Sequence, residues 1–341
     1  MKWIGIILVF IAGAVAATLG LVMYEARGSA QAPGGGRQAA GAADPAPGTK
    51  LSIEELRKRW FDVSVGRKLR PKSWPNNAKT VVTFAFDVNG TGAWVDTLDI
   101  PENSKAQSEY GQYEGVPRIL AMMKKYNIPA TFYVPAVTVI FYPQTLKGIV
   151  DNNPRNDVAL HGWMHENHIL VSEPEARRLL KQASDYLTKE TGKRPVGINF
   201  PGARPGKASM RLAKEIGLLY DGSMMGGDDA YEINLDGQPS GLVEIPIKWI
   251  LNDTMYFGQN GALPSPEAMF KIWTDEFDIA YAEGSLANFT MHPTNGGHRS
   301  VMPHFERFIQ HIKSKGDVWI ASRAEVAAYV KKNVLDVPPT Q

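Results

Sequence analysis

The sequence Asp-Val-Ala-Leu-His-Gly-Trp-Met-His-Glu-Asn-His occupies residues 157–168. Its apolar run, Val158 to Leu160, predicts a short buried strand. His161 and His165 follow directly and are four residues apart, so a helical turn would place both imidazoles on one face, where they could share a metal ion. Because α/β folds and barrels place their chemistry where strands end, this position favours a metal site over a chance pair of histidines.

Short apolar runs alternate with longer amphipathic ones from about residue 78 onward. The pattern predicts strands at 81–86, 130–134, 158–160, 196–200, 243–250, 286–291 and 318–321. It predicts helices around 119–127, 143–150, 176–187, 210–216, 265–282 and 305–313, and a last one opened by a capping box at Ser322. About seven strand–helix repeats indicate one α/β domain, residues 78–334, with a parallel sheet closed into a barrel.

Polar side chains follow most of the predicted strands. They are Asp87 and Asn89, His161 and His165, Asn199, Asn252 and Asp253, and His292. The carboxyl ends of barrel strands face a single site, so these side chains are expected to meet. Metal-assisted hydrolysis needs metal ligands, a carboxylate base and a histidine that protonates a leaving group, and the set contains all three. One aspartate after a strand is more often a turn or cap residue, so the prediction depends on all of these polar residues occurring at strand ends.

Composition excludes several kinds of site. The 341 residues carry a net charge of +2, which gives no reason to expect a nucleic acid or an acidic polymer as partner. There is no cysteine, so disulfides, thiolate zinc sites and cysteine nucleophiles are excluded. Imidazoles and carboxylates therefore remain as the metal ligands to consider.

The N-terminus predicts membrane attachment. Residues 3–24 are almost wholly apolar, a length that spans a bilayer as a helix and exceeds the core of a cleavable signal peptide. The small-residue site at 30–32 is followed by Pro33, which disfavours cleavage there. We expect residues 1–24 to be an uncleaved signal anchor in the cell membrane, with the domain on the periplasmic or extracellular side. Secretion after signal cleavage is the alternative.

The segments that flank the domain differ in composition. Residues 25–49 are rich in Gly, Ala and Pro and predict a flexible linker. Residues 50–77 are predicted to form an N-terminal arm, and the capping-box pattern Ser52-x-x-Glu55 predicts a helix within its stretch 51–65. Residues 335–341 are expected to be a tail.

Three motifs resemble the polysaccharide deacetylase family, also called the NodB-homology domain or carbohydrate esterase family 4. They are Phe84-Ala85-Phe86-Asp87, His161-Gly162-Trp163-Met164-His165 followed by Glu166-Asn167, and Thr290-Met291-His292-Pro293. The likeness runs from about residue 72 to 333 and includes 115–120, 128–132, 191–195 and Tyr220-Asp221. It implies a distorted, incomplete (β/α) barrel. The variety resembled contains peptidoglycan deacetylases and allantoinase-like proteins.

The resemblance implies removal of an N-acetyl group from a sugar, assisted by a divalent ion, zinc first and cobalt or nickel as alternatives. Carried over by position, His161 and His165 would hold the metal, Asp87 would be the general base and His292 the acid. Asp253 would be a third catalytic residue, the surviving member of an acidic pair. The implied substrate is an N-acetylated envelope or extracellular glycan, such as peptidoglycan or an N-acetylglucosamine polymer of the kind that chitooligosaccharide deacetylases use.

Three positions depart from the family pattern. One is Asn252, which stands beside Asp253 where two acids are often found. Asn89 stands where the family has a metal-binding aspartate, and its neutral amide oxygen should hold zinc more weakly. Asn199 stands where an arginine commonly orients the base, and we assign it to substrate binding. Trp163 and Trp249 are candidates for a sugar-stacking wall, although burial in the barrel core explains such residues equally well.

These departures from the family pattern leave two other functions open. One is hydrolysis of a different non-peptide C–N bond with weak or no metal dependence. The other is a carbohydrate-binding domain whose catalytic site has decayed. The sequence predicts no oligomeric state.

Overall fold

The computed structural model describes residues 46–90, 100–258 and 265–337. The predicted membrane anchor, nearly all of the predicted linker and the end of the predicted tail lie outside these residues. Within them, no helix is both long enough and apolar enough to cross a membrane. The chain divides into two compact units, Met1–Glu54 and Glu55–Gln341. The described part of the first unit contains a 3-10 turn, Pro47–Lys50, and the start of helix α2 (Ile53–Trp60).

The second unit is built on a ten-stranded sheet with the order β1-β7-β8-β6-β5-β4-β3-β2-β10, to which β9 is added beside β2. The strands are β1 (Val63–Lys68), β2 (Thr80–Asp87), β3 (Thr131–Val134), β4 (Asp157–Leu160), β5 (Gly197–Ile198), β6 (Tyr220–Asp221), β7 (Tyr231–Leu235), β8 (Gln238–Glu244), β9 (Leu286–Met291) and β10 (Val318–Ala321). All pairs from β8 through β6, β5, β4, β3 and β2 to β9 and β10 are parallel. Only β1, β7 and β8 pair in antiparallel fashion.

The parallel sheet curls into an incomplete barrel. Strand β2 pairs with β9 along one edge, and with β10 and then β3 along successive halves of the other. The free edge of β9 meets the chain beyond β8 at one bridge, where Asn252 lies beside Thr290 and the Asp253 N–H donates to the Thr290 carbonyl at 3.2 Å. The barrel predicted from the strand–helix repeats is therefore confirmed as a curled sheet, closed only at its carboxyl rim.

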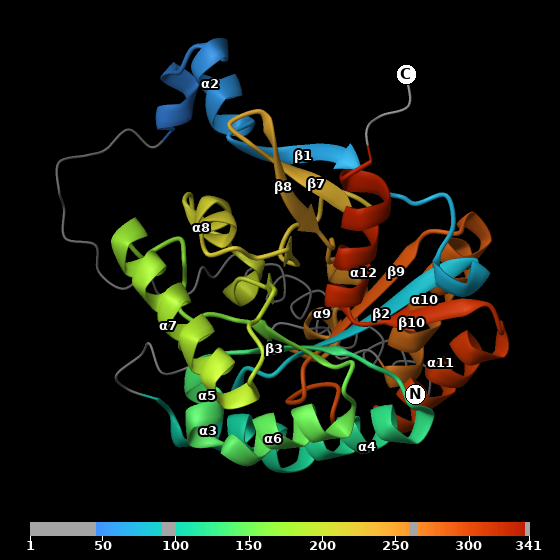
Figure 1. Cartoon of the computed structure of the whole chain (residues 1–341). Helices are drawn as coiled ribbons and strands as arrows, with labels where there is room; N and C mark the ends of the chain where they lie inside the picture. The colour runs from blue at the N-terminus through green and yellow to red at the C-terminus, as the bar shows by residue number, and fades with distance from the viewer. Residues whose placement is uncertain (1–45, 91–99, 259–264, 338–341) are drawn as a thin grey trace, which may run out of the picture. The chain divides into compact units, whose positions relative to one another are not determined.

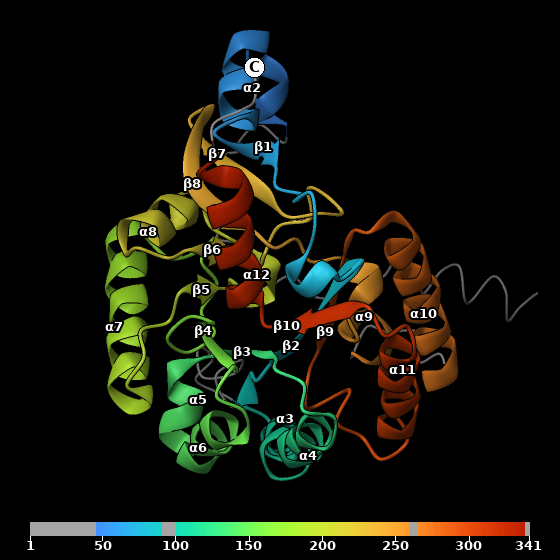
Figure 2. The same ribbon diagram turned by 45° about the vertical axis from the view of Figure 1, so that its right-hand side comes forward.

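Most of the described helices surround the outer face of this sheet (Figures 1 and 2). These are α3 (Glu102–Tyr110), α4 (Val116–Tyr126), α5 (Ala136–Phe141), α6 (Pro143–Asn152), α7 (Glu173–Thr191), α8 (Ser209–Glu215), α10 (Pro266–Glu283), α11 (Met302–Ser314) and α12 (Arg323–Val330). Helix α2 (Ile53–Trp60) buries none of its residues, and the short helix α9 (Thr254–Phe257) follows η6 (Trp249–Leu251) near the end of β9. The expected helix starts are confirmed where caps were predicted. The Ser265 side chain accepts from the Ala268 N–H, and Ser322 and Glu325 form a full capping box.

The core lies between the strands and these helices. Every residue of β2 is buried, which is the pattern of a central strand covered on both faces. On the outer face, Phe289 of β9 contacts Trp273 of α10 and Phe308 of α11, with ring centroids 5.1 Å and 4.8 Å apart. These aromatic contacts fix β9, and with it the residues just beyond its end, against two long helices.

Three predicted elements differ from the structure. The strand predicted at 243–250 overlaps the end of β8. Strand β8 begins earlier, at Gln238, because it forms a hairpin with β7, and it ends at Glu244. Its two-residue loop, Asp236-Gly237, has φ of 53° and 72°, the left-handed conformation of the tightest hairpin turns. The strand predicted at 196–200 is only two residues long. The helix predicted within 51–65 ends at Trp60, and β1 then joins the sheet beside β7.

Gly197 of β5 lies so close to Tyr220 of the paired strand β6 that no side chain fits at this position. An added Cβ would lie 1.9 Å from Cζ of Tyr220, whose ring is held by a 2.6 Å hydrogen bond from its hydroxyl to Asp157. We expect Gly197→Ala to lower the free energy of unfolding by about 1–3 kcal/mol, measured by urea denaturation, because the ring has no free direction in which to move.

Gly148→Ala is the matched control. Its Cβ would meet only the movable Leu120 methyl, at 3.2 Å, and the exchange in helix α6 should be neutral or stabilising by up to about 1 kcal/mol. Equal stabilities for the two variants would contradict the packing at Gly197.

Candidate active site

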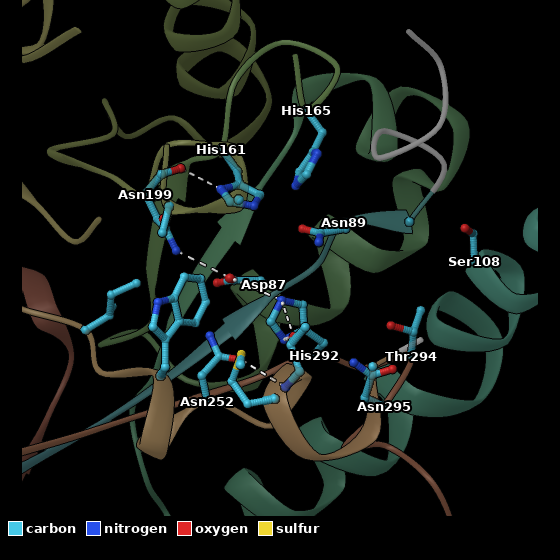
Figure 3. A pocket seen from close by; sticks show the side chains of 18 of the residues that line it. Asp87, Asn89, Ser108, His161, His165, Asn199, Asn252, His292, Thr294 and Asn295 are labelled. Carbon is cyan, nitrogen blue, oxygen red and sulfur yellow. Dashed lines mark hydrogen bonds and ion pairs between the residues drawn. The ribbon is translucent and has the colours of Figure 1, made fainter. Parts of the chain in front are cut away.

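A cavity of about 490 Å³ opens at the carboxyl ends of the strands (Figure 3). The residues predicted for the site that line it are Asp87, Asn89, His161, His165, Asn199, Trp249 and His292. They come from five separated stretches of the chain, and the barrel brings them together as their positions at strand ends predicted. Two predicted residues, Trp163 and Asp253, are not part of the lining.

The loop after β4 holds the histidine pair without a helix. Gly162 and His165 have φ of 75° and 68°, so the backbone turns through left-handed conformations. Both carboxylate oxygens of Glu166 accept backbone N–H groups, from Trp163 at 3.1 Å and Met164 at 2.9 Å. The two imidazoles still meet, with ring centroids 4.8 Å apart. The assumption of a helical turn was therefore wrong, although the expected proximity is confirmed.

The environment of the two histidines keeps both rings neutral. His161 Nδ1 lies 2.5 Å from the Asn199 carbonyl, to which it donates, so its buried Nε2 carries a lone pair and has no protein partner. Burial lowers the pKa of His161. Burial and the neighbouring His161 and His292 lower the pKa of His165 to about 3. At neutral pH both rings are ready to act as ligands.

The donor set fits a divalent metal only in part. Asn89 Oδ1, like His161 Nε2, is buried without a hydrogen-bond partner among the described residues, and such atoms are costly unless a ligand satisfies them. Figure 3 shows Asn89, His161 and His165 turned toward the same space. Within residues 46–90, 100–258 and 265–337, however, no group of three or more His, Asp or Glu side chains could hold a metal. Two imidazoles and a neutral amide oxygen make an open site that leaves most of the ion's charge uncompensated.

His292 is held as a cation by Asp253. The carboxylate of Asp253 is fully buried and accepts from His292 Nδ1 at 2.7 Å and from its backbone N–H at 2.8 Å. Burial opposes the charged ring, but Asp253 and Asp87 outweigh it and raise the pKa of His292 to about 9. Asp253 was predicted to be catalytic. Because it lies behind His292 and outside the cavity lining, it positions and charges that histidine.

One carboxylate oxygen of Asp87 is held by neighbouring side chains. Oδ2 lies 3.3 Å from Asn199 Nδ2, which donates to it, and 3.4 Å from His292 Nε2, whereas Oδ1 has no hydrogen-bond partner among the described residues. Asn199 thus joins Asp87, through its side chain, to His161, through its carbonyl. It was predicted to bind substrate, and the structure adds a positioning role that the sequence did not indicate.

Of the two tryptophans predicted for the site, Trp249 lines the cavity and Trp163 does not. Trp249 lines it with 42% of its surface exposed, together with Met255. Trp163 packs edge-on against Tyr186, with ring centroids 6.1 Å apart, as the core interpretation of this residue required.

The sequence analysis missed five lining residues with hydrogen-bonding side chains, namely Gln107, Ser108, Thr254, Thr294 and Asn295. Asn252 also lines the cavity; it was expected among the strand-end residues but was given no role. Thr254, Thr294 and Asn295 are close in sequence to Asp253 or His292, and this proximity could have identified them. Gln107 and Ser108 lie on α3, which no motif connects to the site.

Comparison with known proteins agrees with this geometry. A family model described as polysaccharide deacetylase matches residues 108–220. The chain is similar to the peptidoglycan deacetylase of Helicobacter pylori, with 27% identity over 287 residues that cover 74% of this chain and 97% of that protein. It is also similar to a peptidoglycan deacetylase-like protein of Gibberella zeae, with 26% identity over 277 residues, 69% of this chain and 81% of the other.

Solved structures share the whole barrel. A Mycobacterium smegmatis structure assigned to the polysaccharide deacetylases superposes with a TM-score of 0.71 at 27% identity, covering 82% of this chain and 98% of the other. The match at residues 108–220 and these similarities show a polysaccharide deacetylase domain. The chain is thus a hydrolase of the polysaccharide deacetylase kind, as its motifs implied. The family fold extends to an allantoinase, with a TM-score of 0.72 at 24% identity over 80% of this chain and 96% of that one.

The pair formed by His292 and Asp253 predicts how kcat/KM depends on pH. In Asp253→Asn the counter-charge of His292 is lost, so its pKa should fall from about 9 toward 6.5. An acid whose pKa falls loses its proton at lower pH, and the alkaline limb of kcat/KM should move to lower pH with it. At pH 8 the protonated fractions at these two pKa values predict roughly a 30-fold loss.

Thr254→Val is the control, since Thr254 Oγ1 lies 2.9 Å from His292 Nδ1 but carries no charge. Its alkaline limb should stay near that of the parent. An unshifted limb in Asp253→Asn would show that His292 is not the titrating acid.

Proposed function

We propose that the protein is a metal-dependent N-deacetylase that hydrolyses the acetamide of an N-acetylated glycan. Peptidoglycan or an N-acetylglucosamine polymer, in the cell envelope or outside it, is the proposed substrate. The observation that carries the proposal is the pair formed by Asp87 and His292, 3.4 Å apart beside two neutral imidazoles. The name of the Helicobacter pylori relative supports the choice of glycan.

Hydrolysis of an amide requires a base for the attacking water and an acid for the departing amine. Asp87 Oδ1 is buried in the cavity wall without a partner, so it can accept the proton of a water that enters. His292 carries a proton that its raised pKa retains at neutral pH, and it can deliver this proton to the amine nitrogen. Asn199 and Asp253 hold these two groups in place.

The neutral imidazoles of His161 and His165 and the Asn89 amide oxygen would hold the metal, proposed to be zinc with cobalt or nickel as alternatives. When bound, the ion would supply Lewis-acid polarisation of the acetyl carbonyl. The chain contributes the fixed His161 tautomer, set by the Asn199 carbonyl, and a loop held by Glu166. Asn89 neutralises none of the ion's charge, so we propose weaker binding than a carboxylate would give.

A second candidate is metal-independent hydrolysis of another non-peptide C–N bond. The observation that favours it is the neutral Asn89 in a site where the described residues form no three-membered His, Asp or Glu cluster. We further propose a single-pass location in the cell membrane with the catalytic unit exported. The apolar stretch 3–24 supports this location.

Acetate release from N-acetylglucosamine oligomers and peptidoglycan tests the function. The parent should release acetate with zinc and stop with chelator. Asn89→Asp should bind zinc more tightly, by at least about tenfold, the size of effect that even a ligand's own hydrogen-bond partner has. Zinc affinity is measured separately by calorimetry, so binding and turnover are read independently.

Three outcomes decide between the functions. Activity that survives exhaustive chelation would favour the metal-independent hydrolase. Activity in Asn89→Asp alone would mean that the parent site has decayed at this ligand. Glycan binding without turnover in either protein would identify a binding domain and overturn the proposal.

The cavity wall predicts where the glycan binds. Trp249→Ala should raise KM roughly tenfold with little change in kcat, because a stacking contact made equally in the ground and transition states contributes only to binding. Trp163→Phe, a change in the tryptophan that packs on Tyr186, should leave KM unchanged. A fall in kcat in Trp249→Ala at constant KM would contradict a simple sugar platform.

A further inference from the structure

Helix α2 carries an apolar face that is exposed. Ile53, Leu56 and Trp60 recur at positions i, i+3 and i+7, so they share one side of the helix. Their exposed fractions are 69%, 39% and 79%, and Phe61, the next residue, is 52% exposed. No residue of α2 is buried. A soluble surface rarely exposes several large apolar side chains together, so this face indicates a binding surface.

The charges around this face are arranged asymmetrically. At 3.6 residues per turn, Arg57 and Arg59 border the apolar stripe on its two sides. Glu54, Glu55 and Lys58 lie on the opposite side of the helix. Guanidinium groups beside an apolar stripe can bury their stems with it and place their heads among lipid phosphates. A tryptophan at the end of the stripe suits the boundary between acyl chains and headgroups. This pattern is that of a helix lying in the surface of an anionic bilayer.

The position of α2 in the chain favours the same partner. The stretch 3–24, predicted to span a bilayer, is separated from Ile53 by residues 25–52, which reach at most roughly 100 Å in any conformation. At its other end α2 leads into Asp62, which pairs with Arg211 at 2.5 Å, and into strand β1 of the sheet. The apolar face therefore lies on the segment that connects the predicted anchor to the catalytic unit, and a nearby membrane would be present at high effective concentration.

We propose that α2 is an interfacial helix that binds the surface of an anionic phospholipid bilayer through Ile53, Leu56, Trp60 and Phe61, with Arg57 and Arg59 at the phosphates. It gives the catalytic unit a second attachment to the membrane beside the predicted anchor. The inference does not depend on the reaction proposed for the cavity.

The absence of cysteine from the chain makes the test direct. Leu56→Cys and, on the opposite side of the helix, Lys58→Cys are each labelled with an environment-sensitive fluorophore in the full chain. The proteins are reconstituted into vesicles of phosphatidylcholine, or of equal parts phosphatidylcholine and phosphatidylglycerol. In the anionic vesicles the label at 56 should emit at shorter wavelength and resist an aqueous quencher, and the label at 58 should stay in water.

The two arginines supply the second arm. Adding Arg57→Gln or Arg59→Gln to the labelled Leu56→Cys protein should lower the ratio of membrane-bound to free label about fivefold each in anionic vesicles. Equal emission from positions 56 and 58 would overturn the proposal, as would a shift at 56 that is the same in both kinds of vesicle. A shift that grows with the number of chains per vesicle would assign the face to a second copy of the chain instead.

Discussion

One backbone bridge, between Asn252 and Thr290, determines the chemistry of the cavity. It brings the chain beyond β8 against the free edge of β9, and the very next residue, Asp253, then lies behind His292. Without this closure the carboxylate would have no histidine to charge, and the imidazole beside Asp87 would lose its proton near neutral pH. The aromatic packing of β9 on α10 and α11 keeps the edge in position.

The barrel interior beneath the site is polar and contains a buried guanidinium and two buried carboxyl groups. Arg323 is fully buried, and its guanidinium donates to neutral oxygens of Asn288, Tyr133 and Thr290 at 2.8–3.0 Å. Two of these partners are on β9, just before His292. Deeper in, burial and the adjacent carboxyl of Asp221 raise the pKa of Glu244 well above its usual range, so these two acids retain a proton between them. Such a network is stable only when all its members are placed together.

The sequence predicted elements best where burial was strong and periodic. Strands β2, β3, β4, β9 and β10 and most helices were found because their apolar patterns are local. It failed at β1 and β7, whose side chains alternate weakly and whose position depends on pairing with one another. The Asp236-Gly237 turn was a local signal for the hairpin that the prediction did not use. The helical turn expected between His161 and His165 failed because spacing alone does not distinguish a helix from a left-handed loop stabilised by Glu166.

The sequence by itself determined the fold class, most of the residues that meet in the cavity and the resemblance to the polysaccharide deacetylases, because strand-end positions and motif spacing are properties of local sequence. It also singled out Asn89 as the residue that should weaken the proposed metal site. Only the tertiary structure decided how these residues act. It placed Trp249 in the cavity wall and Trp163 outside it, and it brought Gln107 and Ser108 to the cavity. It also showed that Asp253 holds His292 and that Asn199 holds Asp87. These outcomes depend on contacts between residues far apart in the chain, and on burial that sets the charge of each histidine, neither of which a local pattern contains.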